Sequence, residues 1–414
     1  MEIRPIISTL RRHKLTATLL TLQVAFTCAI VCNVAFMIAN RVQQVSLPSG
    51  LDENVLSVIH STGIGPDAET NPWAQHEADL AALRAIPGVE SVVAVSYALP
   101  LNRNEWSSGT CPDKQALDRA MQVMSMHGTG CIDSSIYNGS PGLIPTLGLN
   151  LVVGRNFLPD EYVLGQKTPP VAIISQALAH RFYPGQDPLG KEMYNGAKSP
   201  IRVIGVVKTL LRPNLHGTGT NYDSIIWPQK PNSPGSDYVM RSAPQNRERI
   251  LKAAKAALLK VNPSRIINPK YTQTYTQIRA EYFQRDTTMI GLLIASALGL
   301  LFVTALGITG LANFWVGQRT RSIGIRRAIG ATRGDILRYF QTENFLIVTF
   351  GVVLGVLLSI GLNLLLMQHY ELPRLPLWYL PVGAGMLWLL GQLAVLAPAL
   401  RASRVPPVVA TRSV

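Results

Sequence analysis

Charged side chains are scarce in this sequence. They make up 15% of its 414 residues, whereas a typical soluble domain has about 25%. Four stretches contain no Asp, Glu, Lys or Arg at all, namely 15–40, 287–318, 344–370 and 375–400. Each is longer than the roughly 20 residues that an α-helix needs to cross a bilayer. The sequence therefore predicts an α-helical membrane protein, with transmembrane helices at 15–40, 283–316, 341–367 and 378–400.

The first of these stretches is the most polar. It contains Thr16, Gln23 and Asn33, and a cleaved signal peptide is the alternative interpretation. A retained helix is favoured because the uncharged run is longer than the apolar region of a signal peptide. The following residues 41–44 also lack a small-residue cleavage pattern.

The basic excess is concentrated in three short segments. Of the formal net charge of +14, +3 lies in 1–14, +5 in 317–339 and +3 in 401–414, while the 242 residues of 41–282 carry only +4. Lys and Arg beside membrane helices mark the cytoplasmic face. This predicts a membrane protein that contacts membrane lipids and binds no nucleic acid; its placement in the inner membrane of a bacterium is what the family resemblance described below implies. Segments 1–14, 317–340 and 401–414 would be cytoplasmic, and 41–282 and 368–377 would lie outside.

Signatures of catalysis and of metal binding are missing. The seven histidines form no HxxxH or HExxH pair, and no GxSxG motif occurs. Residues 185–191 have the spacing of a phosphate-binding loop, but Glu192 stands where that loop needs a Ser or Thr to bind Mg²⁺. That stretch is interpreted as a turn. We expect a non-enzymatic chain with no cofactor and no metal of its own.

The four cysteines fall into two pairs. Cys28 and Cys32 lie in the first predicted helix, where they are expected to pack against another helix as small apolar side chains. Cys111 and Cys131 lie in the predicted extracytoplasmic segment, where an oxidising compartment allows a disulfide. Two separate reduced thiols are the alternative.

Residues 41–282 have the mixed pattern of an α+β domain. Helices are predicted after Asn71 and Pro72, from 176 through Phe182 and over 245–260, and strands over 89–95, 171–175, 201–207 and 266–274. Between Tyr275 and Thr287 no Pro, Gly or turn cluster occurs. A single unbroken helix is therefore predicted to run from this domain into the second membrane helix, and a short helix-loop-helix is the alternative.

The basic segment 317–340 joins two predicted membrane helices and carries apolar residues among its arginines. Gly330 and Ala331 allow a break, and Thr332 is a good N-cap for a helix from Arg333. A helix at the lipid headgroups would explain the charges alone. Docking of a protein partner explains the Ile-Gly and Ala-Ile-Gly-Ala elements better. The candidate docking residues are Arg319, Ile323, Gly324, Arg326, Arg327, Ala328, Gly330, Ala331, Arg333 and Ile336.

At this segment the sequence resembles the MacB/FtsX family of ABC permeases, whose coupling segment reads approximately RxxEIGxRRAxGAxxxxI. The resemblance continues outside it, in Gly154-Arg155 and Phe157, in 171–175, in 188–191 and 203–207, and in the closing stretch 398–404. It implies a MacB-like periplasmic core domain at 41–282 and an FtsX-like permease domain at 283–407. It also implies two subunits that pair in the membrane, each docked on an ATPase that binds the ATP, and a periplasmic adaptor as a further partner.

Two departures from the family pattern shape the expected assembly. Ser322 replaces the family's acid before Ile323, so we expect a heterodimer with a second permease that keeps the acid. The ATPase domain that MacB carries at its N-terminus is absent here, so we expect a separate ATPase subunit. The expected function is export or mechanotransmission, and the alternatives are an FtsX-like regulator of an envelope enzyme and a lipoprotein-releasing permease.

Overall fold

The computed structural model describes residues 14–65, 69–96, 98–165, 168–196, 198–215, 219–370 and 375–406. The predicted cytoplasmic ends at 1–13 and 407–414, and positions 371–374 of the predicted outer loop, lie outside these residues. The chain divides into two units, which are treated separately below. Residues Met1–Ser46 and Arg285–Val414 form the membrane-helix unit, and Leu47–Gln284 form the outer unit.

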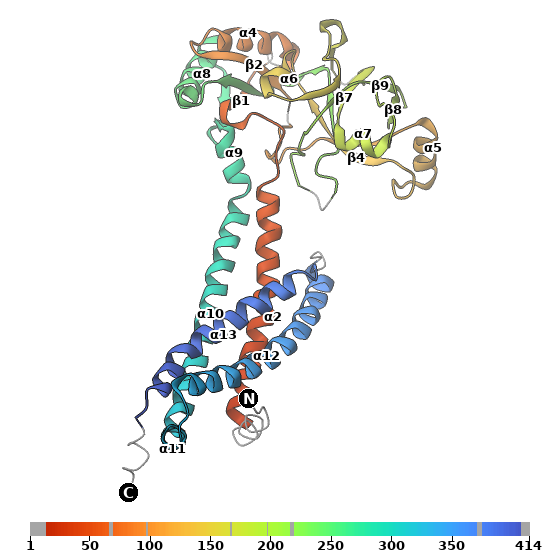
Figure 1. The fold of residues 1–414 in the computed structure, drawn as a ribbon. Helices are drawn as coiled ribbons and strands as arrows, with labels where there is room; N and C mark the ends of the chain where they lie inside the picture. Colours follow the sequence, from red (N-terminus) through yellow and green to blue (C-terminus); the bar gives the residue numbers. More distant parts are fainter. Residues whose placement is uncertain are drawn as a thin grey trace. The chain divides into compact units, whose positions relative to one another are not determined.

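The membrane-helix unit contains four helices that are long and apolar enough to cross a bilayer (Figure 1). They are α2 (Lys14–Val45), α10 (Gln284–Gln318), α12 (Arg333–Tyr370) and α13 (Tyr379–Ser403), and the short α11 (Thr320–Ala328) joins α10 to α12. Helix α12 begins inside the segment 317–340, because Thr332 caps it there. Along the described residues, α2 precedes the outer unit and α10, α12 and α13 follow it.

Glycines bring α2 and α12 into close contact. A Cβ added at Gly351 would lie 2.7 Å from the Cβ of Val24, and one at Gly355 would lie 2.5 Å from the Cβ of Cys28. These two glycines form a GxxxG pair, which lets membrane helices approach at their backbones. Cys32 is likewise buried against Gly383 of α13. The prediction that both thiols face neighbouring helices is confirmed.

Polar contacts reinforce this packing inside the apolar unit. Asn33 of α2 donates to the Oγ of Ser359 on α12 at 3.0 Å. Thr27 of α2 and Thr304 of α10 share a hydrogen bond of 2.8 Å between their hydroxyls. Hydrogen bonds of this kind connect helices where lipid offers no alternative partner. They explain why the first helix has the most polar sequence of the four.

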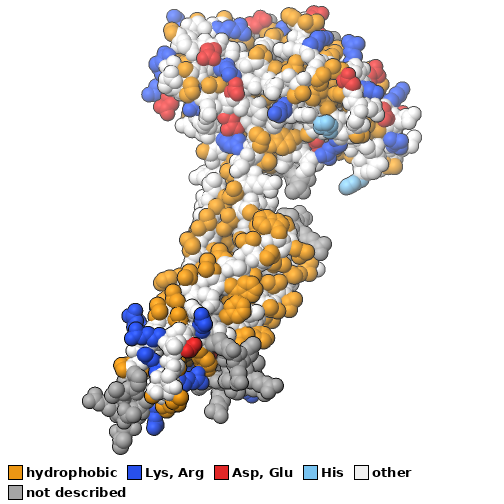
Figure 2. All heavy atoms as spheres, viewed as in Figure 1, with side chains coloured by type: hydrophobic (Ala, Val, Ile, Leu, Met, Phe, Trp, Pro, Cys, Tyr) orange, Lys and Arg blue, Asp and Glu red, His pale blue; other side chains and the backbone are white. Residues whose placement is uncertain are grey.

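Helix α10 buries only one narrow stripe. Its buried residues are Thr304, Ile308, Ala312 and Trp315, which recur at helical spacing. Leu292, Leu298 and Phe302 are each at least 60% exposed within the unit. Many apolar side chains lie on the face of the membrane-helix unit that Figure 2 shows, as expected of a surface in contact with lipid or with another membrane subunit.

The described residues of the outer unit form two large sheets and one small two-stranded sheet. The first has the strand order β13 (Arg265–Ile267), β1 (Leu56–Gly63), β12 (Gly235–Ser242) and β2 (Val89–Val95), with β14 (Gln273–Thr274) also paired to β1. Its helices are α4 (Pro72–Arg84) and α8 (Arg247–Val261). Both pack on this sheet through one apolar cluster, which includes Leu80, Leu83, Tyr238 and Ile250.

The second sheet has the order β5 (Leu151–Gly154), β9 (Pro200–Val207), β7 (Val171–Ser175), β10 (Ser224–Trp227), β4 (Ile132–Asn138), β3 (Ser107–Cys111) and β8 (Glu192–Asn195). Strand β8 also pairs with β9, so the sheet closes on itself. The remaining strands are β6 (Val163–Leu164) and β11 (Gln229–Lys230), and the remaining helices are α5 (Lys114–Val123), α6 (Leu143–Leu147), α7 (Gln176–Phe182) and α9 (Tyr275–Tyr282).

Several sequence predictions are confirmed in this unit. Strand β2 coincides with 89–95 and β7 with 171–175. The side chain of Asn71 caps α4 by accepting from the backbone N–H of Ala74 at 3.2 Å, with Pro72 at the first helical position. Residues 185–191 form the turn between α7 and β8. Cys111 and Cys131 are joined by a disulfide, which links the end of β3 to the residue before β4.

Two predictions near the end of the outer unit are wrong. The strand predicted at 266–274 is divided into β13 and β14 by the short 3₁₀ helix Pro269–Tyr271, because proline has no N–H for a strand ladder. The predicted unbroken helix is interrupted at Phe283, between α9 and α10. Phe283 is only 2% exposed, and the guanidinium carbon of Arg279 lies 5.4 Å from the centre of its ring. Burial of this ring accompanies the break.

A buried ion pair fastens the first sheet to α4. Arg265 makes two hydrogen bonds of 2.8 Å to the carboxylate of Asp79, and both side chains are almost fully buried. The hydroxyl of Tyr238 donates to the same carboxylate at 2.6 Å and lies 2.8 Å from Nδ1 of His76. Burial lowers the pKa of His76. Losing one partner from such a network would leave a buried charge unpaired.

The glycine contact between α2 and α12 generates a stability prediction. Gly355→Ala places a methyl group against Cys28 and the carbonyl oxygen of Ala25, so the two helices must move apart. We expect a loss of about 1–3 kcal/mol, measured as a lower midpoint of thermal unfolding of the full chain in detergent. Gly361→Ala, on the same helix with no atom within 4 Å of the added Cβ, is the matched control. Equal melting of the two variants would contradict this packing.

Candidate docking site

Helix α11 and the turn after it are held in a defined shape by local interactions. Gly330 takes a φ of 110°, a conformation that other residues rarely adopt, and this ends α11. The hydroxyl of Thr332 accepts from the backbone N–H of Asp335 at 3.2 Å, and the Asp335 carboxylate accepts from the backbone N–H of Thr332 at 3.0 Å. This reciprocal cap starts α12. The prediction that Thr332 is the N-cap is confirmed.

One face of α11 is buried against the other helices of its unit. Ile323 and Ile336 are each 4% exposed. Ile323 of α11 forms one apolar cluster with Ile336 and Phe340 of α12 and with Ala399 and Ala402 of α13. Gly324 is buried beside them. Three of the candidate docking residues, Ile323, Gly324 and Ile336, therefore anchor the segment from within.

Two candidate arginines also point inward. Arg319 donates to Oε2 of Glu343 at 2.7 Å, and Glu343 is only 1% exposed. Arg327 donates to the carbonyl oxygens of Ser403 and Val405 at 3.0 and 3.1 Å. These carbonyls lie at the end of α13, where a helix leaves acceptors without partners and favours positive charge. Arg319 and Arg327 thus tie α11 to α12 and α13.

The opposite face of the segment is exposed and combines apolar with basic side chains. Ile329 is 81% exposed and Ile325 is 45% exposed. The guanidinium of Arg326 stacks over the ring of Tyr339 at 5.0 Å. Of the other candidates, Ala328, Gly330 and Arg333 are exposed and Ala331 is half-buried. The basic side chains gather at this end of the membrane-helix unit (Figure 2).

Sequence reasoning missed several residues of this site. The spacing of Ile325 and Ile329 by four residues could have indicated a second apolar stripe on α11. No local signal marks Glu343, Ser403 or Val405, since each meets its arginine across a distance of 24 to 78 residues. Among the described residues, no group of three or more His, Cys, Asp or Glu side chains could hold a metal ion.

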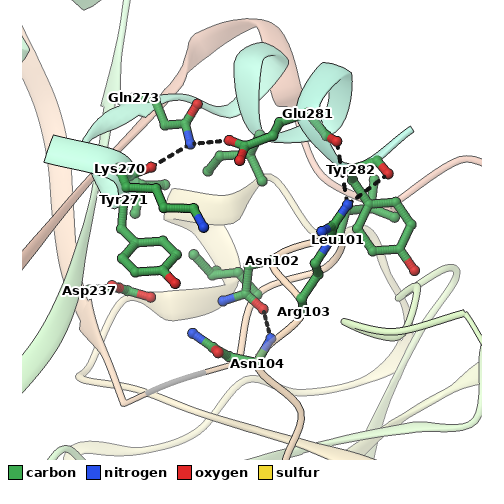
Figure 3. A pocket seen from close by; sticks show the side chains of 13 residues that line it. Leu101, Asn102, Arg103, Asn104, Asp237, Lys270, Tyr271, Gln273, Glu281 and Tyr282 are labelled. Atoms are coloured by element: carbon green, nitrogen blue, oxygen red, sulfur yellow. Dashed lines mark hydrogen bonds between the residues drawn. The ribbon is translucent and has the colours of Figure 1, made fainter. Parts of the chain in front are cut away.

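A pocket in the outer unit lies beside the end of α9 (Figure 3). The pocket encloses about 100 Å³ and is lined by residues that include Arg103, Asp237, Lys270, Glu281 and Tyr282. Arg103 donates to the carbonyl oxygen of Tyr282 at 3.2 Å, and its guanidinium carbon lies 5.4 Å from the centre of the Tyr282 ring. The loop that carries Arg103 is thereby attached to the last turn of α9.

Comparison with known proteins identifies both parts of the chain. Residues 15–263 match the MacB-like periplasmic core domain, and residues 294–407 match the FtsX-like permease C-terminal domain. The chain belongs to the MacB/FtsX family of ABC permeases. Membership makes it a membrane permease of the bacterial ABC type.

Named relatives belong to the same family. The uncharacterised ABC transporter permease YknZ of Bacillus subtilis is 28% identical over 288 residues, which are 68% of this chain and 70% of YknZ. The macrolide export ATP-binding/permease protein MacB of Bordetella avium is 29% identical over 233 residues, which are 53% of this chain. This chain spans 34% of the length of that MacB.

Two solved structures of extracytoplasmic regions are also similar. The extracellular domain of YknZ matches with a TM-score of 0.32 and 17% identity, over 51% of this chain and 99% of that domain. The periplasmic region of MacB from Actinobacillus actinomycetemcomitans matches with a TM-score of 0.34 and 16% identity, over 58% of this chain and 97% of that region.

The ion pair that holds α11 generates a second stability prediction. Arg319→Ala leaves the Glu343 carboxylate buried without its cation, which we expect to cost about 3 kcal/mol. The midpoint of thermal unfolding in detergent should fall for Arg319→Ala and hardly change for Arg321→Ala, an exposed arginine two residues away. Adding Glu343→Gln to Arg319→Ala should recover part of the loss. If the two arginine variants melted alike, the anchoring role of Arg319 would be disproved.

Proposed function

We propose that this chain is the permease subunit of an export or mechanotransmission system, in which a separate ATPase binds and hydrolyses the ATP. The ATPase docks on the exposed face of segment 317–340, which we place in the cytoplasm together with both chain ends. ATP-driven motion of the ATPase is passed through the membrane helices to the outer unit, which is periplasmic. The chain itself performs no catalysis.

The observation that carries this proposal is the division of α11 into two faces. Its inner face is anchored by Ile323, Arg319 and Arg327. Its outer face presents Ile325 and Ile329, with arginines around them. Exposed apolar anchors beside arginine are the composition of a protein-binding hot spot. Because the inner face is tied to both α12 and α13, a force applied to the outer face would move these helices rather than bend a loose loop.

The fastening of α9 supports transmission through the outer unit. Arg279 of α9 donates to Glu53 at 2.6 Å and to the carbonyl oxygen of Leu47 at 2.7 Å. Tyr275 is fully buried and donates to the carbonyl oxygen of Pro100. These bonds, with that of Arg103 to Tyr282, attach two separate segments, 47–53 and 100–103, to one short helix. A displacement of α9 would therefore be carried to the body of this unit.

The docking proposal predicts the effect of a charge on the exposed face. Ile329→Asp buries a carboxylate in the proposed interface, so the ATPase should no longer co-purify with the chain in mild detergent. Ile266→Asp, at a residue of the outer unit that is 58% exposed, is the matched control and should retain the ATPase. The measurement is phosphate release from ATP by the purified complex, with the ATPase subunit identified by mass spectrometry.

Loss of the ATPase in both variants, or in neither, would contradict docking at Ile329. Normal melting of each variant must be shown alongside, since misfolding would also remove the partner.

The dimer that we propose is a heterodimer. Ser322 occupies the position of the family's acid, is exposed, and donates to the carbonyl oxygen of Arg319 at 2.9 Å. It therefore supplies no negative charge to the ATPase. A second permease that keeps the acid would supply one carboxylate per complex for contact with the ATPase. We expect the same mild-detergent preparation to contain two different permease chains. A preparation that holds only copies of this chain, at full ATPase occupancy, would refute the heterodimer.

A further inference from the structure

The outer unit contains a cleft large enough for a ligand. Its volume is about 960 Å³, within the range of about 300–1,000 Å³ that is typical of small-molecule sites. Strands β3, β4, β10 and β11 contribute residues to its walls, together with the loop at 103–106. Neither the docking segment nor the membrane helices contribute to it.

Two tryptophans form an aromatic corner in this cleft. Trp106 is 39% exposed and stands edge-on to Trp227, with their ring centres 5.3 Å apart and their planes at 87°. Trp227 is 5% exposed, and its indole N–H has no hydrogen-bond partner among the described residues. Buried tryptophan N–H groups normally have a partner.

The charged residues that line the cleft are already engaged. Arg103 binds the end of α9, and Glu105 accepts from the buried Arg212 at 2.8 Å. The ammonium group of Lys230 lies 4.8 Å from the centre of the Trp73 ring. The rest of the polar lining consists of amides and hydroxyls, including those of Asn104, Asn232, Ser107 and Ser108. Among the described residues, the lining therefore offers mainly neutral hydrogen-bonding groups around an exposed aromatic face.

We propose that this cleft binds an uncharged, hydroxyl-rich ligand with an apolar face, which is the chemistry of a saccharide. The C–H face of a sugar ring can pack on Trp106, and amide groups both donate to and accept from sugar hydroxyls. A peptide strand is disfavoured, because β3, β4 and β10 each already have neighbours on both sides in the closed sheet. They offer no edge for strand addition.

This inference goes beyond the proposed coupling to an ATPase and is independent of it. The cleft belongs to the outer unit alone, so binding requires neither nucleotide nor partner. If the proposal holds, the outer unit binds a ligand by itself. A saccharide would then be the class of substrate for the proposed export function.

The test is calorimetric titration of the full chain in lipid nanodiscs, which avoids sugar-based detergents. The probes are maltotriose, triacetylchitotriose and an uncharged blocked trialanine. We expect saturable binding of at least one sugar, weakened at least tenfold by Trp106→Ala, which removes the aromatic face. Ser107→Phe, which fills the cleft and removes no aromatic ring, should weaken binding as strongly. Trp378→Ala, at an exposed tryptophan of the membrane-helix unit, should leave it within twofold.

Three results would overturn the proposal. They are no saturable sugar binding up to about 10 mM, sugar binding that Trp106→Ala and Ser107→Phe leave unchanged, and binding of the blocked peptide in place of the sugars. Ile329→Asp separates this proposal from the docking proposal, because it should abolish ATPase recruitment and leave sugar binding intact.

Discussion

Burial of one face of α11 is the constraint on which the organisation of the membrane-helix unit depends. Ile323 and Ile336 pack against Phe340, Ala399 and Ala402, and this removes apolar surface from water on three helices at once. The same packing leaves Ile325 and Ile329 exposed, since at 3.6 residues per turn the positions two and six residues after Ile323 lie on the other side of the helix. An exposed apolar face beside arginines thus follows from how the inner face is buried.

The long helices differ in how completely they are packed. Helices α2, α12 and α13 meet at Gly351, Gly355 and Gly383, where the absence of a side chain allows close approach. Helix α10 contributes only a stripe that ends at Trp315. A helix with so much exposed apolar surface suits a family that assembles as a dimer in lipid, because it can meet a neighbour without disturbing the core of its own unit.

In the outer unit, stability and binding are served by different groups. Arg212 and Arg265 are fully buried and satisfied by carboxylates, and they hold the loops and sheets in place. The proposed ligand cleft instead exposes Trp106 and neutral polar groups. Of the cations in its lining, Arg103 is held by the end of α9 and Lys230 by the ring of Trp73, so recognition of an uncharged ligand would depend on stacking and on neutral hydrogen bonds.

The sequence by itself determined the class of protein. Uncharged runs of sufficient length predict the four apolar helices, basic clusters predict their orientation, and the ordered motifs led to the family. Local chemistry also predicted the caps at Asn71 and Thr332, because a cap depends only on residues three positions apart. The break at Phe283 escaped prediction, since no Pro or Gly marks it and the burial of its ring depends on the folded domain.

Only the tertiary structure decided which residues of the docking segment face outward. The sequence placed ten candidates in one segment, but it could not separate Arg319 and Arg327 from Arg326 and Arg333. That separation depends on Glu343 and on the end of α13, which are distant in the chain. The cleft with Trp106 and Trp227 has the same origin, because its lining is drawn from strands that become neighbours only when the sheet closes.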